Sequence, residues 1–180
     1  MARPQLDSPY LRELEKRVLI YDGAMGTSIQ RFNLTPDDFG GKSLEGCNDN
    51  LVITRPDVIQ AIHESFLAVG VDVVETCTFQ STPRRLTEWG LGDKTRDINI
   101  AAARIARAAA DKYGTREKPR FVAASMGPTG MLPSSSDPAL GNITFDELAR
   151  NFHDQAQYLI EGGVDLLLIE TSQDILEVKA

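Results

Sequence analysis

The sequence predicts an α/β fold in which short buried strands alternate with amphipathic helices. Four segments are too short for helices and are largely apolar on both faces, as strands of a parallel sheet are. The stretch between neighbouring segments is long enough for one right-handed crossover. The chain is therefore predicted to be a series of β/α units. The predicted strands are Val18–Asp22, Val71–Glu75, Phe121–Ser125 and Val164–Glu170.

Helices are predicted where apolar residues recur every three or four positions. One such segment begins at Pro56 and ends before Gly70, because proline suits the first turn of a helix and glycine its end. A second covers residues 98–109. A third begins at Thr144, where Glu147 three residues later completes a capping box. These boundaries place one helix between each successive pair of strands.

One sequence pattern occurs in two of the predicted units. Gly70-Val-Asp-Val-Val-Glu-Thr76 returns as Gly163-Val-Asp-Leu-Leu-Leu-Ile-Glu-Thr171. Each segment is a helix-ending glycine, a strand and then Glu-Thr. The repetition supports successive units of one architecture.

The position of the polar residues favours a closed barrel over an open sheet. Each predicted strand is followed by a polar or glycine-rich cluster: Asp22–Gly23, Glu75–Thr76, Ser125–Pro128 and Glu170–Thr171. All strand ends of a barrel face one mouth, whereas a doubly wound sheet needs such residues only near its switch point. We expect a (β/α)8 TIM barrel. Residues 1–180 would be its N-terminal half, about four β/α units, with residues 1–16 as an N-terminal helical extension.

Composition and charge restrict the partners and the compartment. A net charge of -7 and a pI near 4.9 argue against nucleic acid or an anionic membrane, which attract clusters of Lys and Arg. The sequence has no apolar run of the roughly 20 residues that cross a bilayer, and no signal-peptide pattern. With only Cys47 and Cys77, a disulfide scaffold is not expected. We therefore expect a cytoplasmic protein with reduced thiols.

Six motifs along the chain resemble successive signatures of the homocysteine S-methyltransferase domain. Each motif is weak alone, but together they are specific, because they span nearly the whole chain in order. The Asn-Ile-Thr-Phe motif looks most like the cobalamin-dependent methionine synthase branch of this family. The motifs are Asp22-Gly-Ala-Met-Gly-Thr27, Cys47-Asn-Asp49, Glu75-Thr-Cys-Thr-Phe79, Gly127-Pro-Thr129, Asn142-Ile-Thr-Phe-Asp146 and Ile169-Glu-Thr171.

The resemblance implies methyl transfer to the sulfur of homocysteine. It implies methylcobalamin as the donor on a separate module, with methyltetrahydrofolate regenerating it on a folate-binding module. It also implies zinc, because a thiol of pKa about 8.5 is mostly protonated at neutral pH and a Lewis acid holds it as the thiolate. The zinc ligands of the family are three cysteines of the second half of the barrel. They are expected beyond Ala180, so the 180-residue chain by itself is expected to be inactive and to hold no catalytic residue.

The substrate-binding residues are predicted at the strand ends. Asp22 and Glu170 are carboxylates suited to the ammonium group of the substrate, and Glu170 is the better candidate because it ends an otherwise apolar strand. Gly23 lets a ligand approach the backbone. The remaining candidates lie at the ends of the next two strands and are Glu75, Thr76, Cys77 and Gly127.

Simpler structural roles remain open for these residues. Asp22 could only organise its glycine-rich turn, Glu75 could make a structural hydrogen bond, and Gly127 could be part of a tight turn. Cys77 stands where relatives commonly carry asparagine. The cysteines show no zinc-ligand spacing with the histidines, so they are interpreted as small, partly buried residues. The two histidines, His63 and His153, are predicted to be solvated or capped at the surface of helices.

Other functions remain as alternatives. Within the family, the methyl donor could be betaine or S-methylmethionine. A nicotinamide- or phosphate-binding enzyme is disfavoured, because the turn Gly23–Gly26 lacks the G-x-G-x-x-G pattern and no P-loop lysine follows it. A non-catalytic α/β module that binds a small molecule is also compatible with the sequence.

Overall fold

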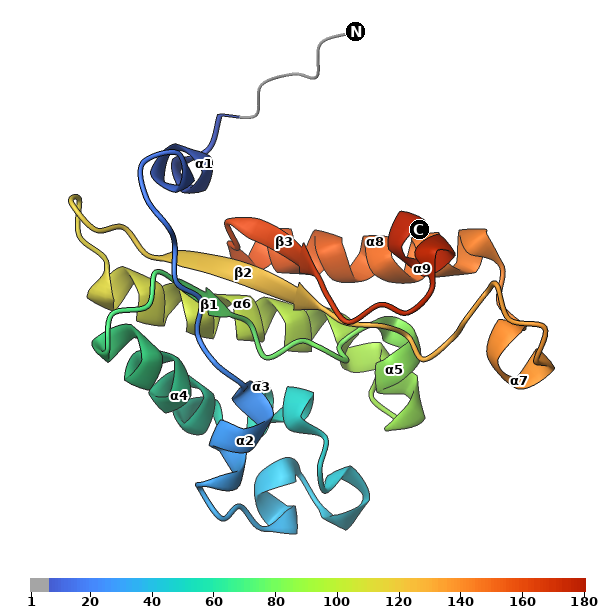
Figure 1. The fold of residues 1–180 in the computed structure, drawn as a ribbon. Helices are drawn as coiled ribbons and strands as arrows, with labels where there is room; N and C mark the ends of the chain where they lie inside the picture. Colours follow the sequence, from blue (N-terminus) through green and yellow to red (C-terminus); the bar gives the residue numbers. More distant parts are fainter. Residues whose placement is uncertain (1–6) are drawn as a thin grey trace, which may run out of the picture.

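The structure is a computed structural model that describes residues 7–180, and it contains a parallel sheet covered by helices on one face (Figure 1). The sheet order is β1-β2-β3, with β1 at Val73–Glu75, β2 at Phe121–Met126 and β3 at Leu166–Ile169. Val73 is in register with Phe121, and Ala123 is in register with Leu166. An α/β fold with a parallel sheet is therefore confirmed.

The helices lie between and after the strands. The α-helices of the described chain are α1 Pro9–Leu14, α2 Met25–Gln30, α3 Leu51–Thr54, α4 Pro56–Ala68, α5 Pro83–Glu88, α6 Thr95–Tyr113, α7 Pro138–Gly141, α8 Phe145–Gly162 and α9 Ile175–Lys179. Short 3-10 helices cover Pro36–Phe39, Lys42–Leu44, Asn48–Asn50 and Gly92–Lys94. No helix among residues 7–180 has the length and apolar character needed to cross a bilayer.

The three long helices form where the apolar periodicity predicts them. The helix predicted from Pro56 is α4, and Gly70 after it has a φ of +105°. The second is α6, which extends beyond the predicted residues 98–109 at both ends. In α8 the Thr144 hydroxyl accepts the Glu147 N–H at 3.2 Å, and the Glu147 carboxylate accepts the Thr144 N–H at 2.8 Å. The capping box is confirmed.

Apolar clusters on the two faces of the sheet show how it is covered. On one face, Val74 and Val122 pack against Leu67 of α4 and alanines of α6, and Met126 packs against Leu159 of α8. Figure 1 shows these helices along that face. On the other face, Val73, Phe121 and Ala123 form a cluster that Tyr10 of α1 joins.

The prediction of a continuous strand at Val18–Asp22 is wrong. Only Tyr21 pairs with Val73, in an isolated parallel bridge, and Ile20 accepts the N–H groups of Asp72 and Val73 at 2.7 and 3.1 Å. The segment still lies beside β1 as the next member of the sheet order. It has no second neighbour in the described chain, and Val18 and Ile20 are exposed.

Two strands begin later than predicted for one shared reason. The Asp72 carboxylate accepts the Ile20 N–H at 2.9 Å, and the Asp165 carboxylate accepts the Val122 N–H at 2.7 Å. In each case a side chain replaces the backbone carbonyl that would otherwise extend the ladder. β1 therefore begins after Asp72 and β3 after Asp165. The repeated Gly-Val-Asp of the sequence is a repeated structural device at the amino ends of these strands.

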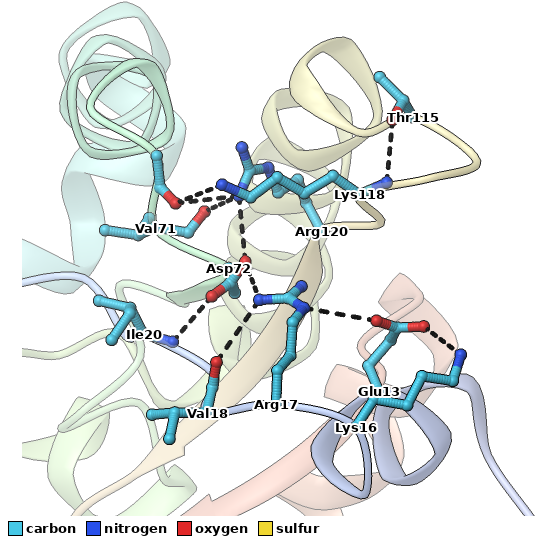
Figure 2. Close-up of polar contacts among 11 residues, drawn as sticks. Glu13, Lys16, Arg17, Val18, Ile20, Val71, Asp72, Thr115, Lys118 and Arg120 are labelled. Atoms are coloured by element: carbon cyan, nitrogen blue, oxygen red, sulfur yellow. Dashed lines mark hydrogen bonds and ion pairs between the residues drawn. The ribbon is translucent and has the colours of Figure 1, made fainter.

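Arginines neutralise both of these aspartates. Arg17, just after α1, pairs with Asp72 at 2.9 Å, and Arg120 pairs with it at 3.3 Å (Figure 2). Arg120 also donates to the Val71 carbonyl at 2.6 Å. Asp165 pairs with Arg107 at 2.7 Å. The amino ends of the strands are thus held by buried or half-buried ion pairs, which leaves the carboxyl ends for the site.

Helix α1 is attached to the sheet near this network. The Tyr10 ring packs edge-on against Phe121 with centroids 5.4 Å apart, and its hydroxyl lies 2.9 Å from the Tyr21 hydroxyl. Of the helical extension predicted for residues 1–16, α1 covers Pro9–Leu14, and residues 1–6 lie outside the described residues.

The structure divides the two histidines. His153 is exposed, as predicted. The prediction for His63 is wrong: it is fully buried in α4, and neither ring nitrogen has a hydrogen-bond partner among residues 7–180. Burial lowers its pKa to about 4. His63 lies four residues after Ile59 and four before Leu67, both buried, so it is on the apolar face of the helix, where packing fixes its position.

Candidate active site at the carboxyl ends of the strands

A cavity of about 490 Å³ lies at the carboxyl ends of the strands. Its walls come from the ends of β1 and β3, from β2 and from the segments that follow residue 22 and β1. Parallel strands place their carboxyl ends on one side of the sheet, so polar residues that are distant in sequence meet there. The lining residues are Asp22, Gly23, Ala24, Met25, Gly26, Gly46, Cys47, Asn48, Asp49, Glu75, Thr76, Cys77, Thr78, Phe79, Gln80, Trp89, Ser125 and Glu170.

Three of the predicted residues are carboxylates that meet in this cavity. Both Asp22 oxygens lie 3.2 Å from the Glu75 N–H, which they accept. Burial raises the pKa of Asp22 to about 7, and the negative charges of Glu75 and Glu170 add to this effect. Burial and the charge of Glu170 likewise raise the pKa of Glu75. Ionisation of Asp22 and of Glu75 is therefore disfavoured until a cation lies near them.

Glu170 is oriented by the neighbouring strand. The Ser125 hydroxyl donates to its carboxylate at 2.5 Å, and the Glu170 N–H donates to the Met126 carbonyl at 3.2 Å. Both backbone and side chain are thus fixed relative to β2. A carboxylate held in this way keeps its remaining lone pairs for a ligand.

Thr76 lines the cavity, but its hydroxyl is already used. It accepts the Ser125 N–H at 3.1 Å and lies 2.6 Å from the Thr78 hydroxyl. Since the Thr78 hydroxyl donates to the Ser125 carbonyl at 2.8 Å, Thr76 must donate to Thr78. These bonds hold the end of β1 against β2. In this arrangement Thr76 builds the wall of the cavity.

The predicted glycines differ in their relation to the cavity. Gly23 lines it, and a Cβ at this position would lie 3.1 Å from the Phe66 ring. Gly127 lies outside the lining: its N–H donates to the Phe79 carbonyl at 3.1 Å, and a Cβ would lie 2.5 Å from that oxygen. Because Phe79 lines the cavity, Gly127 affects the site through this close contact.

Both cysteines line the cavity as buried thiols. Cys77 lies 3.6 Å from the Asn48 carbonyl, to which its thiol donates. Burial raises the pKa of Cys47 to about 11 and that of Cys77 well above the usual value. Thiols of this kind are poor metal ligands, because the thiolate is the form that binds metal. Within residues 7–180, no group of three or more His, Cys, Asp or Glu residues is placed to hold a metal ion. The described residues therefore do not fit a zinc site.

Several lining residues were not predicted as site residues from the sequence, among them Asp49, Trp89 and Met25. Asp49 is buried and accepts the Ser81 hydroxyl at 2.6 Å and the Gln80 N–H at 3.2 Å, so it fixes the segment after β1. Trp89 and Met25 supply apolar wall. The motif Cys47-Asn-Asp49 was the sequence signal for Asp49. Met25 lies within the motif Asp22-Gly-Ala-Met-Gly-Thr27, whereas no local pattern marks Trp89, which the long connection after β1 brings to the cavity.

The charge of the cavity limits what it can bind. Among the described residues that line it, none is Lys, Arg or His, while Asp22, Asp49, Glu75 and Glu170 are acidic. No basic side chain of the described lining would stabilise an anionic group there. A ligand with a cationic group, such as the ammonium of an amino acid, would be stabilised by the carboxylates.

Comparison with known proteins supports the same chemistry. A family model described as homocysteine S-methyltransferase matches residues 19–180. The chain belongs to the homocysteine S-methyltransferase family. It is 40% identical over 174 residues to a methionine synthase of Mycobacterium tuberculosis and 41% identical over 176 residues to one of Mycobacterium leprae. The alignments cover 97% and 98% of this chain but 14% of each relative, so it spans about one seventh of their length.

A solved member of the homocysteine S-methyltransferases has a similar fold. The metallated form of the homocysteine methyltransferase MmuM from Escherichia coli superposes with a TM-score of 0.77, covering 96% of this chain and 60% of that one. Its oxidized form gives a TM-score of 0.76. Sequence identity is 20% and 19%, so the likeness concerns the fold.

Proposed function

We propose that this chain is the N-terminal half of the homocysteine-binding (β/α)8 barrel of a cobalamin-dependent methionine synthase. The observation that carries the proposal is the meeting of Asp22, Glu75 and Glu170 around one cavity without a basic residue in its described lining. The identity of 40% to a methionine synthase over nearly the whole chain supports this branch of the family. The order of the sheet, with residues 18–22 beside β1, is the order that successive barrel units would have.

The residues of this chain would bind and orient the amino-acid end of homocysteine. Glu170, held by Ser125, and Asp22, held by the Glu75 N–H, would accept hydrogen bonds from the ammonium group. Because the pKa of Asp22 is about 7, the incoming ammonium would favour release of a proton from this carboxyl. Gly23 would let the ligand approach the backbone, whereas Thr76, Cys77 and Gly127 would shape the walls. None of these residues is proposed to be catalytic.

Zinc and methylcobalamin belong to other parts of the proposed enzyme. Zinc would hold the homocysteine sulfur as the thiolate that attacks the methyl group. Since residues 7–180 do not form a zinc site, we propose that its cysteine ligands lie beyond Ala180. Methylcobalamin and methyltetrahydrofolate would be bound by separate modules. We propose a cytoplasmic enzyme whose partners are homocysteine and these modules, with no nucleic-acid or membrane partner.

The test is methionine formation by the full-length protein. Homocysteine is supplied with methylcobalamin, with betaine or with S-methylmethionine, and the methyl donor that supports turnover is identified. Of the three methyl donors, only methylcobalamin is expected to support methionine formation. Turnover with betaine or S-methylmethionine instead would place the protein in another branch. Homocysteine binding without turnover under any condition would favour a non-catalytic binding module.

A further inference from the structure

The segment after β3 is tied to β2 and to the segment that follows β2 by three carboxylates. Glu170 accepts the Ser125 hydroxyl at 2.5 Å. Asp174 accepts the N–H and the hydroxyl of Ser134 at 2.6 and 2.9 Å. Glu177 accepts the N–H and the hydroxyl of Thr129 at 2.7 and 2.6 Å. Only the first of these contacts lies in the cavity.

The contact between Glu177 and Thr129 is deeply buried. Glu177 is 2% exposed and Thr129 is 1% exposed, and the second carboxylate oxygen of Glu177 has no partner within residues 7–180. A buried carboxylate with one unpaired oxygen costs free energy, so apolar residues would be more favourable for packing alone. The contact fixes the position of α9 relative to the loop after β2.

Between Glu170 and α9 the chain adopts a strained conformation. Thr171 has a φ of +61°, in the left-handed region that a β-branched residue rarely adopts. Such strain persists only where the surroundings impose the conformation on both sides. Here Glu170 is held on one side by Ser125, and Asp174 and Glu177 are held on the other by Ser134 and Thr129.

We propose that Asp174 and Glu177 are positioning residues that tie α9 to the loop after β2 and thereby hold the strained turn at Thr171 and the Glu170 carboxylate in place for the substrate. This inference rests on the proposed binding of the homocysteine ammonium by Glu170. Without the ties, the turn relaxes out of the left-handed region and Glu170 moves away from the cavity. The ties act through Glu170 and do not touch the ligand themselves.

The test uses the full-length enzyme with two variants that damage the same contact from opposite sides. Glu177→Gln replaces the charged acceptor, and Thr129→Val removes the hydroxyl donor with little change in volume. Each is expected to raise the homocysteine KM roughly threefold to tenfold, the range for a lost hydrogen bond, with kcat and zinc content unchanged. In the same variants, backbone amides of residues 170–176 are expected to exchange hydrogen faster, as measured by mass spectrometry.

Asp165→Asn is the matched control. Asp165 also binds a neighbouring N–H and a side chain, but at the amino end of the strand that Glu170 follows. Its loss is expected to lower stability without changing KM or the exchange of residues 170–176. If the control raises KM as much as Glu177→Gln does, the effect is general destabilisation and the proposal is wrong.

Rescue distinguishes positioning from a purely structural role. Asparagine adopts the left-handed region more readily than threonine, so Thr171→Asn removes most of the strain. In the double variant with Glu177→Gln, Thr171→Asn is expected to restore the homocysteine KM to within about twofold of the wild-type value. The reason is that the turn, once less strained, stays in the left-handed region without the tie. A KM that stays high in the double variant contradicts the proposal.

The outcomes separate this inference from the proposed function. If Glu170→Gln raises KM but the Glu177 and Thr129 variants change neither KM nor exchange, only the positioning role fails. If Glu170→Gln leaves KM unchanged, the proposed role of Glu170 fails. If the protein forms no methionine, hydrogen exchange at residues 170–176 still tests whether Glu177 ties α9 to the loop after β2. Unchanged exchange in Glu177→Gln would show that it does not.

Discussion

The Ser125 hydroxyl and the Glu170 carboxylate are joined by a hydrogen bond of 2.5 Å, which links β2 to the end of β3 at the floor of the cavity. Glu170 follows an otherwise apolar strand, and Ser125 lies near the end of one. Their contact aims a carboxylate into the cavity and leaves it able to accept further hydrogen bonds. The strength of homocysteine binding should therefore depend on both residues.

Glu170→Gln in the full-length enzyme is expected to weaken homocysteine binding by roughly 1.5 to 3 kcal/mol, the range for a hydrogen bond to a charged group. Zinc content should not change, since Glu170 is not proposed as a ligand. Ser125→Ala should act in the same direction and more weakly, because the carboxylate remains. Steady-state KM and metal analysis test this. An unchanged KM in Glu170→Gln would mean that the carboxylate is structural.

Homocysteine affinity is expected to rise with pH around neutrality. The pKa of Asp22 is about 7, above its ordinary value, so without ligand this carboxyl is mostly protonated at pH 6 and mostly ionised at pH 8. The ammonium group prefers the ionised form, and binding below pH 7 must release a proton. Calorimetric titrations at pH 6 and pH 8 measure this. Asp22→Asn should bind more weakly and reduce the dependence on pH, leaving the part that comes from release of the homocysteine thiol proton to zinc. Affinity in the parent that is equal at both values contradicts the assignment.

His63 should make the fold sensitive to acid. Its pKa is about 4 in the folded protein and 6.5 in the reference state, so the unfolded chain binds the proton first as pH falls. The contribution of neutral His63 to the free energy of unfolding is fully present above pH 6.5. It is lost as pH falls toward 4, and the loss is at most about 3 kcal/mol. His63→Leu should reduce this loss, because leucine binds no proton in the unfolded chain. Urea unfolding at pH 5 and pH 8 compares the two proteins, and equal pH dependence would refute the role of His63.

Gly127→Ala and Gly26→Ala should differ sharply. A Cβ at Gly127 would lie 2.5 Å from the Phe79 carbonyl and 2.6 Å from its ring, so the backbone must move and the cavity wall with it. A Cβ at Gly26 would meet only the Asn48 side chain at 3.8 Å, an ordinary contact. We expect Gly127→Ala to destabilise the protein by about 1 to 3 kcal/mol, as overpacking does, and Gly26→Ala to be neutral or stabilising. Thermal melts of both variants test this, and similar melting temperatures would contradict it.

Residues 1–180 expressed alone are expected to associate or to be partly molten. At one edge Val18 and Ile20 are 77% and 55% exposed, and at the other Leu167 and Ile169 are 41% and 56% exposed. Open edges with apolar side chains are templates for association, and contiguous exposed apolar surface favours it further. Size-exclusion chromatography with light scattering and a thermal melt decide this. A 19.8 kDa monomer that unfolds cooperatively would show that these edges are self-sufficient.

The sequence predicts the secondary structure best where the signals are local. The capping box of Thr144, the start of α4 at Pro56 and the alternation of strands and helices need only neighbouring residues, and all appear in the structure. The motifs that resemble the homocysteine S-methyltransferases are also local, and the family is confirmed. The clustering of Asp22, Glu75 and Glu170 at one cavity follows from parallel strands, whose carboxyl ends meet.

Only the tertiary structure decides features that depend on partners from other elements. Residues 18–22 were apolar enough for a strand, but a strand needs a continuous ladder, and Asp72 supplies a side chain in place of one backbone bond. His63 is polar, yet its position on the packed face of α4 buries it. The hydroxyl of Thr76 is consumed by Ser125 and Thr78, residues whose proximity no local pattern shows. The physical reason is common to all three: short-range patterns set which face of an element is apolar, whereas hydrogen-bond partners and burial are set by the elements that pack against it.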